Sequence, residues 1–170
     1  MLQPLARRTW APRGETPVLR AWDRHDRLSV MDAITLAPRR QRLGLYWQIQ
    51  RANVRTEHVL GFLRLLRRHV RGKMVLIWDR GACHKGKPVR DYLERYVRTI
   101  RVEWLPPYAP DLNPCEQVWN HAKYSDLANF VAQDVCDLHE HVESSLQRQR
   151  AQSPLLHSFF KTARLNMKRD

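Results

Sequence analysis

The 170-residue sequence predicts a single α/β domain, in which a mixed sheet is flanked by helices. Three observations support this fold class. Segments with the two-residue period of strands alternate with segments that have the helical period. Residues 74–78 form a continuous apolar run, which is typical of a buried strand. No repeat or linker divides residues 1–170, and this length is sufficient for one substantial core.

The first predicted elements are the two strands of a hairpin. In residues 28–36, alternate positions are occupied by Leu28, Val30, Asp32, Ile34 and Leu36. Residues 43–49 alternate in the same way, and the polar residues 39–41 predict the turn between the strands. Asp32 shares the phase of the apolar side chains, where an unpaired acid costs free energy.

Helices and strands then follow in alternation. A helix with Asn53 as its cap is indicated by the apolar stripe of Val59, Phe62, Leu63, Leu66 and Val70. The strand at 74–78 is followed by a short helix that Pro88 can open, and residues 100–104 alternate like a half-exposed edge strand. Two further helices, marked by apolar positions in 131–146 and 154–160, complete the chain.

Residues 105–123, LPPYAPDLNPCEQVWNHAK, join a stiff loop to a helix. Pro106, Pro107 and Pro110 fix the backbone φ angle and disfavour helix before them. Asn113 is a suitable N-cap, and Pro114 suits the first helical position. Glu116 therefore occupies the third position, where an acid either completes a capping box or serves a site beside the loop.

A second acid, Asp79, comes directly after the buried strand and before Arg80-Gly81. Ligands of open α/β sheets usually bind at the carboxyl ends of the strands. The segment between Asp79 and Glu116 is long enough for a helix, a strand and the proline-rich loop. The two carboxylates can therefore meet.

Two segments resemble the catalytic domain of mariner-related bacterial insertion-sequence transposases, the DDE endonucleases. They are WDRGACH at 78–84 and LPPYAPDLNPCEQVW at 105–119, and the similarity extends to residues 8–14, 27–30 and 127–130. The resemblance implies a ribonuclease-H-like fold and a site that cleaves DNA and transfers 3′ ends with two Mg²⁺ (or Mn²⁺) ions. Asp79 and Glu116 would be the second and third acids and the metal ligands, with His84 and Asn113 as neighbours.

By the same resemblance, the first acid would lie on a strand before residues 8–14. No Asp or Glu precedes Glu15. We therefore expect an N-terminally truncated domain without the family's helix-turn-helix region. We also expect its sheet to lack the central first strand, and the chain alone to be inactive. Asp32 is a candidate surrogate acid, because its strand would neighbour the missing one; alternatively it pairs with an arginine, or is tolerated in a chain no longer under selection.

The charge of the chain predicts a polyanionic partner. A net charge of +13 and a pI near 10.5 favour nucleic acid, although an arginine-rich composition alone could produce them. The candidate DNA contacts are Arg7, Arg8, Arg13, Arg80, Lys85, Lys87 and Lys123. Three cysteines without a CxxC pattern indicate free thiols. No signal or membrane segment is evident, so we expect a bacterial cytoplasmic protein associated with the nucleoid.

Two classes of function follow from these observations. The first is a DDE transposase domain that acts on double-stranded DNA, both transposon ends and target, with an upstream transposase fragment or a second copy as candidate partners. The second is a non-catalytic, basic DNA-binding remnant of a split or decayed transposase gene. An RNA-processing nuclease of the same fold is a third class, which the proline-rich loop disfavours.

Overall fold

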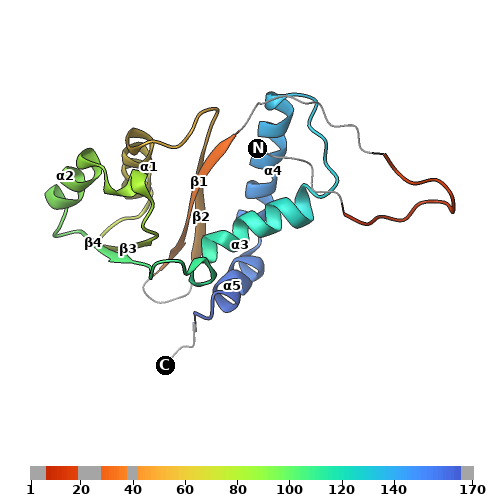
Figure 1. The fold of residues 1–170 in the computed structure, drawn as a ribbon. Helices are drawn as coiled ribbons and strands as arrows, with labels where there is room; N and C mark the ends of the chain where they lie inside the picture. Colours follow the sequence, from red (N-terminus) through yellow and green to blue (C-terminus); the bar gives the residue numbers. More distant parts are fainter. Residues whose placement is uncertain (1–6, 19–27, 38–41, 166–170) are drawn as a thin grey trace.

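The computed structural model describes residues 7–18, 28–37 and 42–165 (Figure 1). Its strands and helices are, in order, β1 (Ser29–Leu36), β2 (Leu43–Gln50), α1 (Thr56–His69), β3 (Met74–Trp78), α2 (Lys87–Arg95), β4 (Ile100–Trp104), α3 (Pro114–His121), α4 (Val135–Ala151) and α5 (Ser153–Thr162). This confirms the predicted order, while the predicted turn at 39–41 lies outside the described residues. None of the described helices has the length and apolar character needed to cross a membrane.

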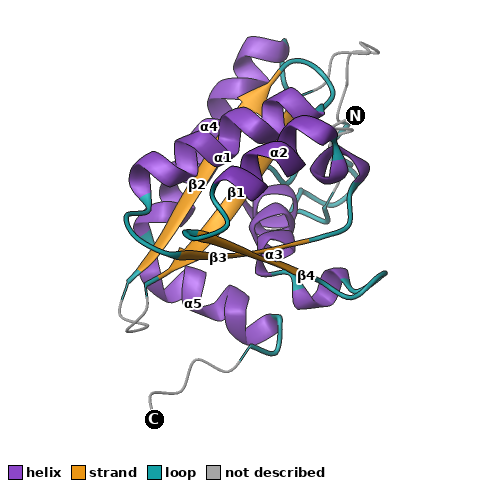
Figure 2. Cartoon of the chain, turned by 90° about the vertical axis from the view of Figure 1, so that its left-hand side faces the viewer, coloured by secondary structure: helices purple, strands orange, loops and turns teal. Residues whose placement is uncertain are grey.

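The strands form two separate two-stranded sheets rather than one continuous sheet (Figures 1 and 2). β1 and β2 are antiparallel, with Ser29 opposite Gln50. β3 and β4 are parallel, with Met74 opposite Ile100. Each described strand therefore has an edge on which no other described strand lies.

Two apolar clusters lie on either side of the β1–β2 hairpin. Figure 1 shows α3, α4 and α5 on one side of this hairpin and α1, α2, β3 and β4 on the other. The first cluster contains Leu45, Val118, Leu138, Val142, Leu146, Leu156 and Phe159. The second contains Val59, Leu63, Trp78, Val89, Tyr92 and Ile100. Val30 packs against the first and Met31 against the second, so the alternation of β1 gives the hairpin two apolar faces.

Two helices begin later than the sequence predicts. The N-cap of α1 is Arg55 rather than Asn53, and its backbone N–H donates to His58 Nδ1 at 3.0 Å. α4 begins at Val135, because the carboxylate of Asp134 accepts hydrogen bonds from the first backbone N–H groups of the helix. A capping side chain satisfies N–H groups that the helix leaves unpaired, so it determines the helix start more strongly than apolar spacing does.

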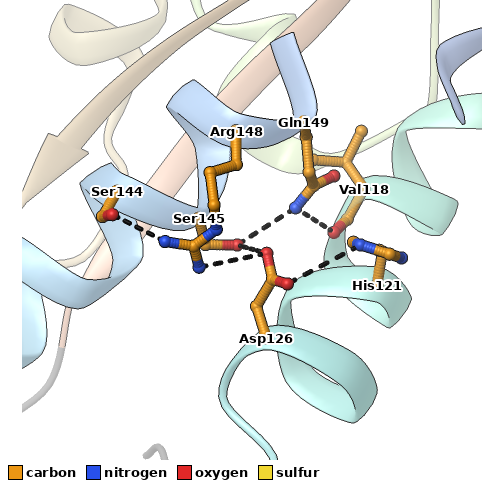
Figure 3. A network of polar contacts seen from close by, with 7 residues as sticks. All are labelled: Val118, His121, Asp126, Ser144, Ser145, Arg148 and Gln149. Atoms are coloured by element: carbon orange, nitrogen blue, oxygen red, sulfur yellow. Dashed lines mark hydrogen bonds and ion pairs between the residues drawn. The ribbon is translucent and has the colours of Figure 1, made fainter. Parts of the chain in front are cut away.

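A polar network joins α4 to the π-helical turn Ala122–Asp126 that follows α3 (Figure 3). Asp126 accepts a hydrogen bond from Ser145 Oγ at 2.6 Å and lies 3.5 Å from the Arg148 guanidinium. The fully buried Gln149 donates from Nε2 to Ser145 Oγ and to the carbonyl of Val118 in α3. Buried polar groups cost free energy unless they are hydrogen-bonded. The network therefore fixes α3, which carries a candidate acid, against α4.

Replacing Asp126 tests this network. We expect Asp126→Ala to lower the free energy of unfolding by about 1–3 kcal/mol, because the buried Ser145 hydroxyl loses its acceptor. Urea denaturation followed by circular dichroism measures the change. The control is Asp91→Ala, which removes an exposed acid of α2 and should shift stability by less than about 0.5 kcal/mol. Equal stabilities of the two variants would contradict a structural role for Asp126.

Candidate active site

The carboxyl ends of β3 and β4 open onto one pocket. Asp79 comes directly after β3, the proline-rich loop 105–110 follows β4, and Glu116 lies in the first turn of α3. All three line the pocket, together with Arg80 and Asn113. The structure thus brings together the two acids that the sequence singles out. The reason is the parallel pairing of β3 with β4, which places both carboxyl ends at one edge.

Backbone contacts hold the proline-rich loop against β3. The N–H of Leu105 donates to the carbonyl of Trp78 at 2.9 Å, and the carbonyl of Leu105 accepts from Arg80 Nε at 3.2 Å. Arg80, a candidate DNA contact, therefore also supports the loop. Tyr108 lies on the pocket wall with a positive φ of 56° and a fully exposed ring. A left-handed tyrosine is unusual, and exposed aromatic rings can stack on nucleobases, a role that the sequence analysis missed.

One oxygen of the Asp79 carboxylate is fixed by its neighbours. Oδ1 accepts a hydrogen bond from the Gly81 N–H at 2.8 Å and lies 3.0 Å from His84 Nδ1. No described residue forms a hydrogen bond or ion pair with Oδ2. The His84 ring stacks on the indole of Trp78, with centroids 4.5 Å apart and planes at 5°. His84 therefore orders the segment after β3, and it orients Asp79.

Glu116 is free of the capping role that its position also allowed. Asn113 caps α3 instead, and its Oδ1 accepts from the Cys115 N–H at 3.1 Å. Within the described residues, the half-buried Glu116 carboxylate forms neither a hydrogen bond nor an ion pair, so the capping-box interpretation is wrong. The carboxylate therefore lines the pocket unpaired.

The Asp32 side chain contacts α3 and is not among the residues that line the pocket. Its Oδ1 accepts from Trp119 Nε1 at 2.9 Å, whereas its Oδ2 is buried without a partner. Burial raises the pKa of Asp32 to about 7; the charge of Glu116 acts in the same direction, and hydrogen bonds from Cys115 and Trp119 act against it. Among the described residues, the partner of Asp32 is thus a tryptophan, and none of the described arginines pairs with it, although pairing with an arginine was one of the alternatives.

The other candidate DNA contacts lie on several elements and are exposed. Lys85 and Lys87 follow Asp79 on the 3₁₀ turn and the start of α2, and Lys123 lies on the π-helical turn after α3. Arg7, Arg8 and Arg13 belong to the N-terminal segment 7–18. Among contacts between described residues, Arg7 is anchored: its N–H donates to Asn129 Oδ1 at 2.6 Å, and its guanidinium lies 5.7 Å from the centre of the Tyr124 ring. These cations are therefore spread over several elements, and no contact among the described residues joins them into one cluster.

A family model described as DDE superfamily endonuclease matches residues 1–138. The chain belongs to this family. The fold of this DDE endonuclease domain is similar to that in the Mos1 strand transfer complex, with 17% identity, a TM-score of 0.62, and coverage of 95% of this chain and 46% of that chain. It is also similar to the catalytic domain of Mos1 mariner transposase, with 15% identity, a TM-score of 0.52, and coverage of 81% and 74%. The ribonuclease-H-like fold class is thus confirmed.

A further similar structure shows how much of a longer transposase chain this DDE endonuclease domain covers. The Mos1 paired-end complex with the left transposon end has a TM-score of 0.60 at 17% identity, with coverage of 95% of this chain and 47% of that chain. The chain therefore spans about half the length of the transposase chains in these complexes. No curated protein matches the sequence.

The two pocket acids of this DDE endonuclease domain suit a divalent metal ion only in part. Asp79 Oδ2 and the Glu116 carboxylate are hard oxygens without a described partner, which Mg²⁺ and Mn²⁺ prefer. The described residues contain no group of three His, Cys, Asp or Glu that could hold a metal ion. The described pocket thus offers two carboxylates, which are too few to hold a metal ion without further ligands. Two ions roughly 3.5–4 Å apart require a further bridging carboxylate.

The titration of Asp32 should be visible in the stability of the domain. The folded pKa near 7 exceeds the ordinary 3.8, so the folded state holds a proton that the unfolded state releases. Stability should therefore be highest below about pH 4 for this group and fall as pH rises towards 7. We expect Asp32→Asn to remove this slope and to raise the free energy of unfolding at pH 8 by about 1–4 kcal/mol.

Urea denaturation at pH 5 and pH 8 checks this expectation. Asp91→Asn, in which the exposed acid of α2 is replaced, is the control and should keep the slope of the unmodified chain. If Asp32→Asn and the unmodified chain lose equal stability between the two pH values, Asp32 does not titrate as its burial indicates.

Proposed function

We propose that this chain forms the catalytic core of a DDE transposase, which cleaves DNA strands and transfers 3′-hydroxyl ends with divalent metal ions. The observation that carries the proposal is that two carboxylates, Asp79 and Glu116, line one pocket at the carboxyl ends of β3 and β4, and that Asp79 Oδ2 and the Glu116 carboxylate have no partner among the described residues. Membership of the DDE endonuclease family supports nuclease chemistry. The similar Mos1 structures, which include a strand transfer complex, a transposon end and a mariner complex with Mn, support DNA and a divalent metal as partners.

In this proposal Asp79 and Glu116 are the catalytic metal ligands. The bound ion supplies activation of the attacking oxygen and stabilisation of the leaving one. Gly81 and His84 keep Asp79 Oδ1 fixed and leave Oδ2 available. Asn113 fixes the first turn of α3 and hence Glu116. Most of the catalysis of phosphoryl transfer comes from such positioning and from electrostatic stabilisation.

We also propose that the chain does not cleave DNA by itself, because two carboxylates cannot bridge two ions. A further acid would arrive on an additional strand, supplied for example by an upstream transposase fragment. The edges of β1 and β3 that have no neighbour among the described strands support this idea, because each offers a row of backbone donors and acceptors to an incoming strand. The second candidate function, a non-catalytic DNA-binding remnant, is favoured by the absence of a third acid from the described groups.

Nicking of a supercoiled plasmid that carries the element's ends tests the function. We expect no Mg²⁺- or Mn²⁺-dependent nicking by the 170-residue chain, and nicking by a chain extended upstream with an acid-bearing strand. In the extended chain, Asp79→Asn or Glu116→Gln should lower the rate at least about 100-fold, since each removes a metal ligand. Asp111→Asn, at an exposed acid of the same loop region, is the control.

Three outcomes of this assay would change the proposal. Nicking that survives Asp79→Asn would remove Asp79 from the site. Nicking by the short chain that disappears in Asp32→Ala would make Asp32 the third acid. An extended chain that binds metal and DNA but never nicks would favour the non-catalytic function.

Metal binding can be measured without activity. We expect one Mn²⁺ ion to bind the 170-residue chain weakly, and paramagnetic resonance of free Mn²⁺ gives the bound fraction directly. Asp79→Asn and Glu116→Gln should each weaken binding about 10-fold or more, because half of the protein ligands are lost. Asp91→Asn should leave it unchanged. Binding that is equal in all four proteins would show that the pocket acids do not hold the ion.

A further inference from the structure

Six exposed cations gather at the amino ends of β3 and β4, the end of this sheet that is opposite to the pocket. We call them the basic rim: Arg67, Arg68, Arg71, Lys73, Arg95 and Arg98. They lie in two segments, residues 67–73 and 95–101, neither of which contains an acid. The proposed catalytic function uses none of these residues.

Backbone pairing turns the two segments into one surface. α1 and α2 both end here, and the N–H of Met74 donates to the carbonyl of Thr99 at 2.8 Å. Lys73 and Arg98, which precede these two residues, therefore lie on neighbouring chain segments. The Arg67 guanidinium lies 3.9 Å from the centre of the Tyr96 ring, which ties the last turn of α1 to the end of α2.

Helix dipoles explain only part of this concentration of charge. Cations in the last turn of a helix interact favourably with its carbonyl end, which accounts for Arg67, Arg68 and Arg95. The other three rim cations lie beyond the helix ends, where the effect fades within about one turn. Within the described residues, none of the six forms an ion pair. One acid, Glu94, directly precedes the second segment. Its single negative charge is small against the six positive charges of the rim.

The positive surface extends along the free edge of β2. The His69 ring at the end of α1 lies 5.3 Å from the Tyr46 ring, and the Arg150 guanidinium of α4 lies 5.6 Å from the same ring. Cations and aromatic rings thus form a track from α2 across α1 and β2 to α4. A track of unpaired cations matches the evenly spaced phosphates of a duplex better than a single small anion.

We propose that the basic rim binds the phosphate backbone of a duplex DNA segment distinct from the segment at the pocket. Asp79 lies six positions after Lys73, so the rim and the pocket are about 20 Å apart along β3. A phosphate bound at the pocket therefore cannot also contact the rim. The rim goes beyond the proposed function, because it requires neither the metal ion nor the pocket acids.

The test measures binding of a fluorescently labelled 20-base-pair duplex to the full chain, without metal, between about 50 and 200 mM salt. Over this range, the affinity of a protein that makes about 6–10 phosphate contacts falls by about 10³–10⁵. The variant is Arg68→Gln/Arg71→Gln/Lys73→Gln. We expect the slope of log affinity against log salt to fall by about 3, and the affinity at 50 mM salt to fall at least about 10-fold. Fluorescence anisotropy gives both values.

A matched control separates the rim from the overall charge. Arg42→Gln/Lys161→Gln/Arg164→Gln removes three exposed cations from other elements, and its slope should change by less than about 1. The charge-preserving variant Arg68→Lys/Arg71→Lys should bind like the unmodified chain. Circular dichroism confirms that each variant is folded. If the rim variant folds and binds like the unmodified chain, or if both triple variants lose equal slope, the proposal is overturned.

Three further outcomes distinguish this proposal from others. Tight binding of polyglutamate that duplex DNA does not displace would assign the rim to an acidic protein and overturn the proposal. Asp79→Asn/Glu116→Gln should keep the salt slope of the unmodified chain, because the pocket acids are not part of the rim. A failed nicking assay combined with a reduced slope in the rim variant would remove the catalytic function and leave the rim in place.

Discussion

The parallel pairing of β3 with β4 is the constraint on which both candidate surfaces depend. It places Asp79 and the proline-rich loop at one end of the sheet. The same pairing places Lys73 and Arg98 together at the other end. The hydrogen bond from the Leu105 N–H to the Trp78 carbonyl extends the β3–β4 pairing one residue beyond the end of β4. It therefore fixes the direction in which the proline-rich loop leaves the sheet. The two pocket acids and the basic rim thereby lie at opposite ends of one short sheet.

The strand edges that no described strand covers are related to the exposure of apolar side chains on β3. A two-stranded sheet is marginal alone, and here each is supported by helices on only part of its surface. The side chains of Val75 and Ile77 on β3 are 59% and 61% exposed, although the sequence predicts a buried strand there. An additional strand with its covering element would pair the edges and bury these side chains. In our proposal, the same addition brings a further carboxylate to the pocket.

Local patterns in the sequence were sufficient for most elements and for the two pocket acids. The strand 74–78 and the Asn113 cap depend on neighbouring residues, and both form as predicted, although the strand is more exposed than the sequence predicts. The contacts that the sequence did not reveal join distant residues. Asp32 bonds Trp119, which no spacing rule indicates, and the rim segments appear in the sequence as separate basic runs. Spacing also could not decide whether Glu116 caps its helix, because Asn113 could satisfy the same end.

The contacts that position Asp79 and Glu116 come from nearby residues. The positions of these two acids therefore do not depend on whether another strand joins the sheet. Asp79 is oriented by contacts within residues 78–84, including the stack of His84 on Trp78. Glu116 is placed by the cap and first turn of α3, and the network around Asp126 holds this helix from behind. Neither support involves the free edges of β1 or β3. A strand added there would therefore need to contribute its own carboxylate, without rearranging the pair already present.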